Sequence, residues 1–170
     1  EPHMTGMGGD MFAILWHADQ RRLVGIDATG KSGSKIDVQQ LIAADSKGVE
    51  GPEGVEGSEG VPSDGARSVT VPGALSGWYA LLESYGERTI AEALQPAIRL
   101  ADEGFPVSPI IARDWASSLD GLRGNAGAAS TFLIDDEAPE AGQWFSNPDL
   151  ADTFRRVAEN GIETFYGGEL

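Results

Sequence analysis

The sequence predicts an α+β fold in which a β-hairpin is followed mainly by helices. The apolar run Met11–His17 and a second run at residues 23–27 are separated by a polar, turn-like segment, which is the pattern of a hairpin. Beyond residue 74, apolar residues recur at helical spacing between residues that typically start and stop helices. With 170 residues, 41% of them hydrophobic, the chain is long enough to bury a core.

The first strand is preceded by a glycine-rich loop at residues 6–9, close to the first residue of the sequence. These glycines come before a strand, whereas a dinucleotide-binding fingerprint follows one, so we interpret them as a tight turn with positive φ and close backbone approach. The continuous apolar run Met11–His17 indicates a strand buried on both faces, and two or three strands cannot form such a sheet alone. We therefore expect the chain to be part of a longer protein that supplies partner strands.

Residues 46–67 are predicted to form a flexible Gly/Glu-rich insertion. Before it, Asp37 can cap a short helix that extends to Ala44. Between residues 48 and 60, glycine occupies every third position, with glutamate before each following glycine. Four triplets are too few for a collagen helix, and evenly spaced like charges favour an extended, mobile loop. We assign all of residues 1–170 to part of a single larger domain that contains this insertion.

Capping signals predict the elements after the insertion. Residues 68–73 form a short strand that ends at its Pro-Gly pair, and an amphipathic helix from Leu75 stops near Gly86. Pro96 interrupts the following helix or restarts it as a first-turn proline. Three helices are expected after Gly86. The first begins at the capping box of Thr89 and Glu92 and ends at Gly104, the second begins at Ser108-Pro109 and ends near Leu119, and the third begins at Asn147-Pro148 and ends at Gly161.

The charge and residue composition exclude several classes of function. Lysine and arginine number 12 against 27 aspartates and glutamates, so the net charge of −15 disfavours binding to phosphate backbones. Cysteine is absent, which excludes disulfides and thiol catalysis, and two histidines are too few for a multi-histidine metal site. No apolar run approaches the roughly 18 residues of a membrane helix. We expect no metal ion, no nucleic-acid partner and no membrane segment in this chain.

Most of the other polar candidates are better explained by structure than by chemistry. His3, beside a proline in a loop, is expected to pack or hydrogen-bond, and His17, at a strand end, is expected to face solvent. The acidic clusters at residues 102–103 and 135–137 could perform acid–base work, but in so acidic a chain they indicate solvated surface. The four tryptophans are predicted to lie in the core.

The loop after the second strand, residues 27–31, is the best candidate for a functional loop, because strand ends often display such loops. The Lys31 ammonium could hold a substrate carboxylate by a charge-assisted hydrogen bond. The alternative is a solvated turn lysine, which is the commoner situation for this residue type.

Four segments carry a family pattern. They are the loop at residues 1–12, Val-Thr-Val-Pro-Gly-Ala-Leu-Ser-Gly-Trp at 69–78, Leu-Gln-Pro-Ala-Ile-Arg-Leu-Ala-Asp-Glu-Gly-Phe-Pro-Val-Ser-Pro at 94–109, and 148–168, which begins Pro-Asp-Leu-Ala and ends Phe-Tyr-Gly-Gly. In order and spacing, and over nearly the whole chain apart from the insertion, they resemble the γ-glutamyltransferase family. Four ordered matches are far more specific than any one of them.

The resemblance implies a fold and a mechanism. These enzymes are N-terminal-nucleophile hydrolases with a four-layer α/β/β/α sandwich, and their precursor cleaves itself so that a threonine begins the small subunit. That threonine attacks a γ-glutamyl amide with its own α-amino group as base, backbone N–H groups stabilise the oxyanion, and the acyl group passes to water or an amine without any cofactor. The chain then corresponds to part of the large subunit. Its implied partners are the small subunit of the same precursor and a small γ-glutamyl or related amide.

The resemblance also assigns substrate binding to Thr29 and Lys31. Typical members have G-R-E-x-A-P after the second strand, where the arginine binds the substrate α-carboxylate, and a divergent branch has G-S-G-R-A-P. Residues 28–33 read Ala-Thr-Gly-Lys-Ser-Gly. Thr29 therefore falls near the arginine of the typical pattern, and Lys31 replaces the arginine of the divergent branch. No catalytic residue is assigned, because none of the internal threonines matches the nucleophile motif, and the 170 residues alone are expected to be inert.

Three alternatives stay open. Lysine keeps the charge of arginine but loses its planar bidentate fork, so an altered acyl group, such as a glutaryl-like one, is an alternative to glutathione-type specificity. An acylase of the same fold that acts on a β-lactam side chain is the second alternative, and a non-catalytic acidic structural or interaction module is the third. Many members of the family are exported, which is compatible with a periplasmic or secreted location, although a cytoplasmic one is not excluded.

Overall fold

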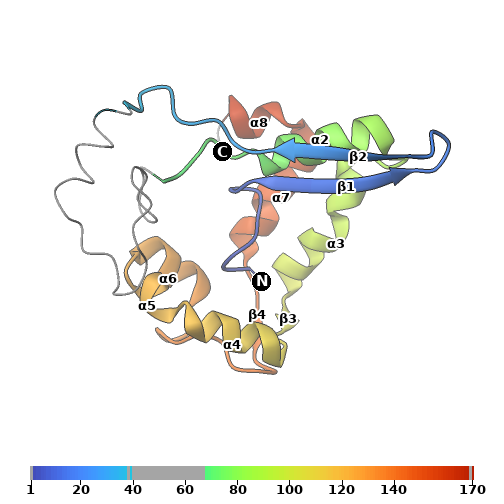
Figure 1. Cartoon of the computed structure of the whole chain (residues 1–170). Coiled ribbons are helices and arrows are strands. Elements are labelled where there is room, and N and C mark those ends of the chain that lie inside the picture. The colour runs from blue at the N-terminus through green and yellow to red at the C-terminus, as the bar shows by residue number, and fades with distance from the viewer. Residues whose placement is uncertain (1, 38, 40–67, 169) are drawn as a thin grey trace. The chain divides into compact units, whose positions relative to one another are not determined.

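The computed structural model describes residues 2–37, 39, 68–168 and 170 (Figure 1). These residues form two units, Met7–Ala74 and a second made of Glu1–Gly6 with Leu75–Leu170. The expected α+β order, a hairpin followed mainly by helices, is confirmed. The predicted insertion at residues 46–67 and the helix expected up to Ala44 lie outside the described residues. In the described part of the chain, no helix has both the length and the apolarity needed to cross a bilayer.

The first unit contains the predicted hairpin. Strand β1 (Met11–His17) pairs antiparallel with β2 (Arg22–Ala28), so that Met11 lies opposite Ala28 at one end and His17 lies opposite Arg22 at the turn. The half-buried positions of both strands alternate with exposed ones. This alternation is typical of a two-stranded sheet that is covered on one face.

The prediction that the first strand is buried on both faces is wrong for the described residues. Phe12 and Ile14 are 70% and 81% exposed, and Trp16 and Leu23 continue the same apolar face across the hairpin. A two-stranded sheet has two faces, and within the described chain the second face is left in solvent. That further strands complete the sheet stays a prediction.

In the other unit, helices α3 (Ile90–Glu103) and α7 (Pro148–Asn160) pack against each other. Their buried residues follow one face of each helix: Leu94, Ile98 and Ala101 on α3, and Ala151, Phe154 and Val157 on α7. Arg155 of α7 forms ion pairs with Asp102 of α3 and with Asp152 of its own helix. Asp102 therefore connects two helices, which the prediction of a merely solvated acidic cluster did not include.

Pro96 lies inside α3 without interrupting it, contrary to the prediction. A proline in this position removes one backbone hydrogen bond of the helix. Leu94 and Ile98, on either side of it, are both buried on the face that packs against α7. Burial of this apolar stripe stabilises the helix beyond what the missing hydrogen bond costs.

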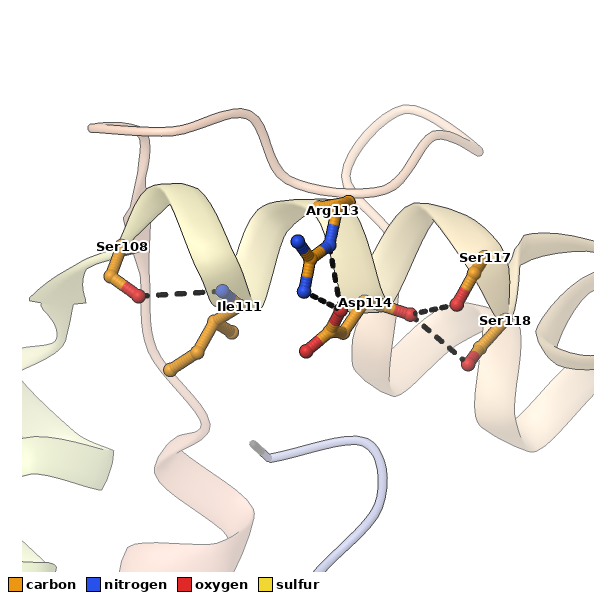
Figure 2. Close-up of polar contacts among 6 residues, drawn as sticks. All are labelled: Ser108, Ile111, Arg113, Asp114, Ser117 and Ser118. Carbon is orange, nitrogen blue, oxygen red and sulfur yellow. Dashed lines mark hydrogen bonds and ion pairs between the residues drawn. The ribbon is translucent and has the colours of Figure 1, made fainter.

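The predicted helix ends are confirmed by their cap geometry. Helix α2 (Ala74–Tyr85) ends before Gly86, and Thr89 and Glu92 form a reciprocal capping box at α3. The Ser108 hydroxyl accepts the Ile111 N–H at the start of α4 (Pro109–Ser117), as Figure 2 shows. Further along α4, the Ser117 and Ser118 hydroxyls donate to the Asp114 carbonyl (Figure 2). The other confirmed caps are the Asn147 side chain, which accepts the Leu150 N–H at α7, and Gly104 and Gly161, which end α3 and α7 with φ of +83° and +81°.

Trp115 is the centre of an aromatic cluster in the same unit. It is fully buried, its ring centroid lies 4.7 Å from that of Phe145 in an edge-to-face arrangement, and His3 stacks on it at 4.8 Å. Val107 and Leu122 complete the buried cluster. The prediction that His3 is a packing residue is confirmed.

The sequence did not predict several short elements of this unit. Strands β3 (Phe105–Pro106) and β4 (Trp144–Phe145) pair antiparallel, and α5 (Leu119–Arg123) and α6 (Ala126–Phe132) lie between them in the chain and contribute residues to the cluster. The last short helix, α8 (Glu163–Tyr166), contacts α7 instead.

The prediction that all four tryptophans lie in the core is wrong for two of them. Trp16 lies on the open face of the hairpin, and Trp144 is 60% exposed. The Trp144 indole N–H donates to the Glu103 carbonyl at 2.8 Å, so the ring covers the C-terminal end of α3. It satisfies a helix-end carbonyl instead of filling the interior.

We predict that Thr89→Ala destabilises the full-length protein by about 1 kcal/mol, because the change removes the acceptor for the Glu92 N–H and one half of the capping box. Chemical denaturation measures this change. Thr131→Ala, at an exposed position within α6, is the matched control and is expected to be neutral or slightly stabilising, because alanine has the higher helix propensity. If the two variants unfolded at the same denaturant concentration, the assigned role of Thr89 would be wrong.

Candidate functional site

The loop after β2 lies at the end of the hairpin where the chain enters β1. Because Met11 pairs with Ala28, the residue before Met11 and the residues after Ala28 lie beside each other. The hairpin therefore places Asp10 next to the loop that contains both predicted substrate-binding residues, Thr29 and Lys31.

Thr29 is held inside the loop by Asp27. The Asp27 carboxylate accepts the Thr29 backbone N–H at 2.9 Å and also accepts the Thr29 hydroxyl. The hydroxyl, followed by the backbone N–H, lowers the pKa of Asp27 below its ordinary value. This carboxylate therefore stays ionised in more acidic solution than an ordinary aspartate does. Since the Thr29 hydroxyl donates to Asp27, it can offer a substrate only its acceptor lone pairs.

Gly30 is held by a residue from outside the loop. Its N–H donates to an Asp10 carboxylate oxygen at 2.7 Å, and the Thr70 hydroxyl approaches the same oxygen at 3.4 Å. Asp10 therefore links the entry of β1, the loop after β2 and the segment that leads into α2.

Lys31 is fixed by its backbone, while its side chain extends into solvent. The Val71 N–H donates to the Lys31 carbonyl at 2.8 Å. Within the described residues the Lys31 ammonium makes no ion pair, and the residue is exposed. The loop thus presents one cation on a restrained backbone.

Two glycines allow the loop and residues 70–73 to cross at close range. A Cβ on Gly30 would lie 1.9 Å from the Val71 carbonyl oxygen, and a Cβ on Gly73 would lie 2.1 Å from the Ala28 carbonyl oxygen. Neither position has room for any side chain. Both glycines are required by space, since neither has positive φ.

Residues 68–73 form no strand, which corrects the prediction. The Val71 N–H bonds to the loop, but the N–H groups of Gly73 and Ala74 both donate to the Gly9 carbonyl, at 3.0 and 2.8 Å. Because successive donors turn to different partners, no regular ladder can form. Gly6 and Gly8 have neither the positive φ nor the close contacts expected of them. The carbonyl of Gly9 is the part of this loop that makes the contact.

The structure thus brings Thr29 and Lys31 into one loop and adds polar residues that sequence reasoning missed. Asp10, Asp27 and Thr70 hold the loop in place. The available signal was a polar residue at each strand end on the same side of a hairpin. Thr70 carried no such signal, because the contact joins positions 60 residues apart.

The other polar candidates make structural contacts. His17, which is half-buried, accepts the Gln20 N–H in the hairpin turn. Arg123 binds the acidic segment at residues 135–137 through Asp136 and Glu137. Among the described residues, no group of three or more histidines, aspartates or glutamates is arranged to hold a metal ion. A shallow surface hollow involves residues 134–143, but its lining includes Asp135, Glu137 and Glu140 and no cation, so it disfavours an anionic ligand.

Comparisons with known proteins agree on one family. The sequence profile of gamma-glutamyltranspeptidase matches residues 1–170. The chain is 33% identical over 172 residues to the glutathione hydrolase-like YwrD proenzyme of Bacillus subtilis (strain 168), with 99% of this chain and 30% of that protein covered. It is 34% identical over 175 residues to the oxamate amidohydrolase proenzyme of Klebsiella pneumoniae subsp. pneumoniae, with the same shares covered.

The crystal structure of cephalosporin acylase from Bacillus halodurans superposes on the chain with a TM-score of 0.80 at 33% identity. The superposition covers 99% of this chain and 30% of that one. The chain thus spans about 30% of the length of the curated relatives it matches.

We predict that Gly30→Ala and Gly73→Ala each destabilise the full-length protein by about 1–3 kcal/mol, because the added methyl group has to displace a backbone carbonyl. Chemical denaturation gives the stability, and hydrogen exchange of the Val71 amide reports the local contact.

Gly33→Ala is the matched control from the same loop. Its Cβ would make an ordinary contact with Ile36 at 3.8 Å, so its stability should stay within about 0.5 kcal/mol of the parent. If Gly30→Ala unfolded at the same denaturant concentration as Gly33→Ala, the close crossing would be wrong.

Proposed function

The chain belongs to the gamma-glutamyltranspeptidase family, and from this we propose that it is part of an enzyme that cleaves a small amide and transfers its acyl group to water or an amine. The chain carries part of the N-terminal-nucleophile hydrolase fold. Its proposed contribution is the loop that binds the acyl part of the substrate, with Lys31 as the cation that holds a carboxylate.

The proposed reaction uses a nucleophile that is not among the threonines of this chain. A threonine at the start of the small subunit attacks the amide carbonyl, and its own α-amino group takes the hydroxyl proton. The tetrahedral oxyanion collapses, the C–N bond breaks, and the amine leaves with that proton. Water or another amine then attacks the resulting ester and releases the threonine hydroxyl. The matched relatives named as proenzymes support a precursor that is cleaved into subunits.

One observation carries the proposed role of Lys31: its ammonium is exposed and makes no ion pair among the described residues, while its backbone is anchored by the Val71 N–H. An ammonium that is already paired would have to exchange partners to bind a substrate, whereas this one has no partner to release among the described residues. The chain carries a net charge of −15, so an anionic substrate depends on a local cation to offset the general repulsion.

The chemistry of the loop favours an acyl group that ends in one carboxylate. Lys31 offers a point charge in place of a planar fork, so it places fewer demands on the angle of the carboxylate than arginine does. The Thr29 hydroxyl, already donating to Asp27, can accept a hydrogen bond from a substrate amine, such as the α-amino group of a glutamyl residue. A γ-glutamyl amide is therefore the proposed substrate class.

A second candidate is an acylase for another carboxylate-bearing amide. The relatives named for oxamate amidohydrolase and cephalosporin acylase activities are as similar to the chain as the glutathione hydrolase-like one. Turnover of a panel of γ-glutamyl anilide, glutaryl anilide and oxamate by the full-length enzyme separates the candidates. Rapid cleavage of the glutaryl amide with no cleavage of the glutamyl one would favour the acylase.

We predict that Lys31→Ala raises KM of the full-length enzyme for its preferred amide about ten- to hundredfold with a smaller change in kcat, because a charge-assisted hydrogen bond to the carboxylate is lost. Lys31→Arg should restore most of the affinity. Lys35→Ala, at an exposed position in the same segment, is the control and should leave KM unchanged. Steady-state kinetics decides, and an unaltered KM in Lys31→Ala would remove this residue from the site.

We also predict that the 170 residues alone do not turn over a chromogenic γ-glutamyl anilide. None of their internal threonines has the free α-amino group that serves as the base. Release of the anilide above the rate in buffer would show that the nucleophile lies within this chain. The full-length enzyme, prepared in parallel, is the positive control.

A further inference from the structure

Asp10 connects three segments that are distant in the sequence. It lies directly before β1, accepts the Gly30 N–H at 2.7 Å, and is approached by the Thr70 hydroxyl at 3.4 Å. A carboxylate that accepts from a backbone N–H makes a stronger hydrogen bond than a neutral acceptor does. Asp10 is exposed, so water competes for it and the gain is modest.

Among the described residues, the contact made by Asp10 is one of two that connect the backbone of residues 30 and 31 to other segments. The Gly30 N–H is fixed by Asp10 on one side of Lys31, and the Lys31 carbonyl is fixed by the Val71 N–H on the other. The two anchors bracket residues 30 and 31. Loss of the first would leave the Lys31 backbone restrained from one side, and the side chain would sample more positions at an entropic cost to binding.

The remaining contacts of the loop do not replace this anchor. Asp27 holds Thr29, but it belongs to the same strand end and moves with the loop. The crossing of Gly30 over Val71 prevents closer approach, but steric contact alone does not hold the two segments together. Among the described residues, Asp10 is the side chain that joins the loop to other segments.

We propose that Asp10 is a positioning residue for substrate binding, which acts by holding the Lys31 loop through its acceptor oxygen and does not touch the substrate. This inference rests on the proposed function, in which Lys31 binds the carboxylate. Because Asp10 is exposed and its charge adds little to the hydrogen bond, the role depends mainly on where the oxygen lies. A negative charge this close to the loop works against an anionic substrate, so geometry is the benefit that Asp10 supplies.

The two ways of changing Asp10 conservatively therefore have opposite effects. Asp10→Asn keeps an oxygen acceptor at the same place and removes the competing charge, so KM of the full-length enzyme should stay the same or fall. Asp10→Glu keeps the charge but displaces the acceptor by one methylene, so KM should rise about tenfold with a smaller change in kcat. Asp19→Ala, an exposed carboxylate at the turn of the same hairpin, is the control and should change neither parameter.

A double-mutant cycle with Lys31→Ala distinguishes positioning from a general loss of stability. If Asp10 acts through Lys31, adding Asp10→Glu to Lys31→Ala should raise KM no further. A general loss of folded enzyme would lower apparent kcat in both backgrounds and leave KM unaltered, which would overturn the proposal. An unchanged KM in Asp10→Glu alone would also overturn the proposal. The same holds for a KM that rises equally in Asp10→Asn and Asp10→Glu.

The same experiment separates this inference from the proposed function. A rise in KM for Lys31→Ala with none for Asp10→Glu overturns the positioning role alone. No change for Lys31→Ala overturns both, because the positioned group would then have no part in binding. If Asp10→Glu does not yield folded enzyme, Thr70→Val is measured in its place. Thr70→Val should raise KM, by less than tenfold. An effect on kcat alone would overturn the positioning role of Asp10.

Discussion

The close crossing between the loop after β2 and residues 70–73 is the constraint on which the candidate site depends. Backbone meets backbone there with no space for a Cβ at Gly30 or Gly73. The crossing brings the Val71 N–H within bonding distance of the Lys31 carbonyl and the Thr70 hydroxyl toward Asp10. Because the Val71 N–H and the Lys31 carbonyl satisfy each other, the two segments are joined without a regular sheet.

Electrostatics gives this restraint its functional meaning. The chain is strongly acidic, and some of its cations are already engaged, such as Arg123 with Asp136 and Glu137 and Arg155 with Asp102. Lys31 is not engaged in this way: its backbone is anchored, while its ammonium makes no ion pair in the described part of the chain. A single cation held in place can offset a generally repulsive surface for a small anion, since its attraction acts at contact distance and the repulsion is screened.

The parts of the fold that depend on neighbouring residues could be predicted from the sequence. The capping box of Thr89 and Glu92, the Ser108 and Asn147 caps and the terminal glycines of α3 and α7 act within one helical turn, so their spacing predicts them. The hairpin was predicted because its two apolar runs and the polar turn between them are equally local. Pro96 was misjudged because packing against α7, which the local sequence does not contain, outweighs one lost hydrogen bond.

By itself, the sequence determined the family, the order of strands and helices, and the loop in which Thr29 and Lys31 lie, since each of these is encoded in contiguous residues. Tertiary structure alone decided which distant segments hold that loop. Asp10 accepts from Gly30 and is approached by Thr70, and the expected strand at residues 68–73 becomes a crossing segment. The reason is that these donors find their acceptors by the path of the chain in space, over as many as 60 residues, and no spacing along the sequence records that path.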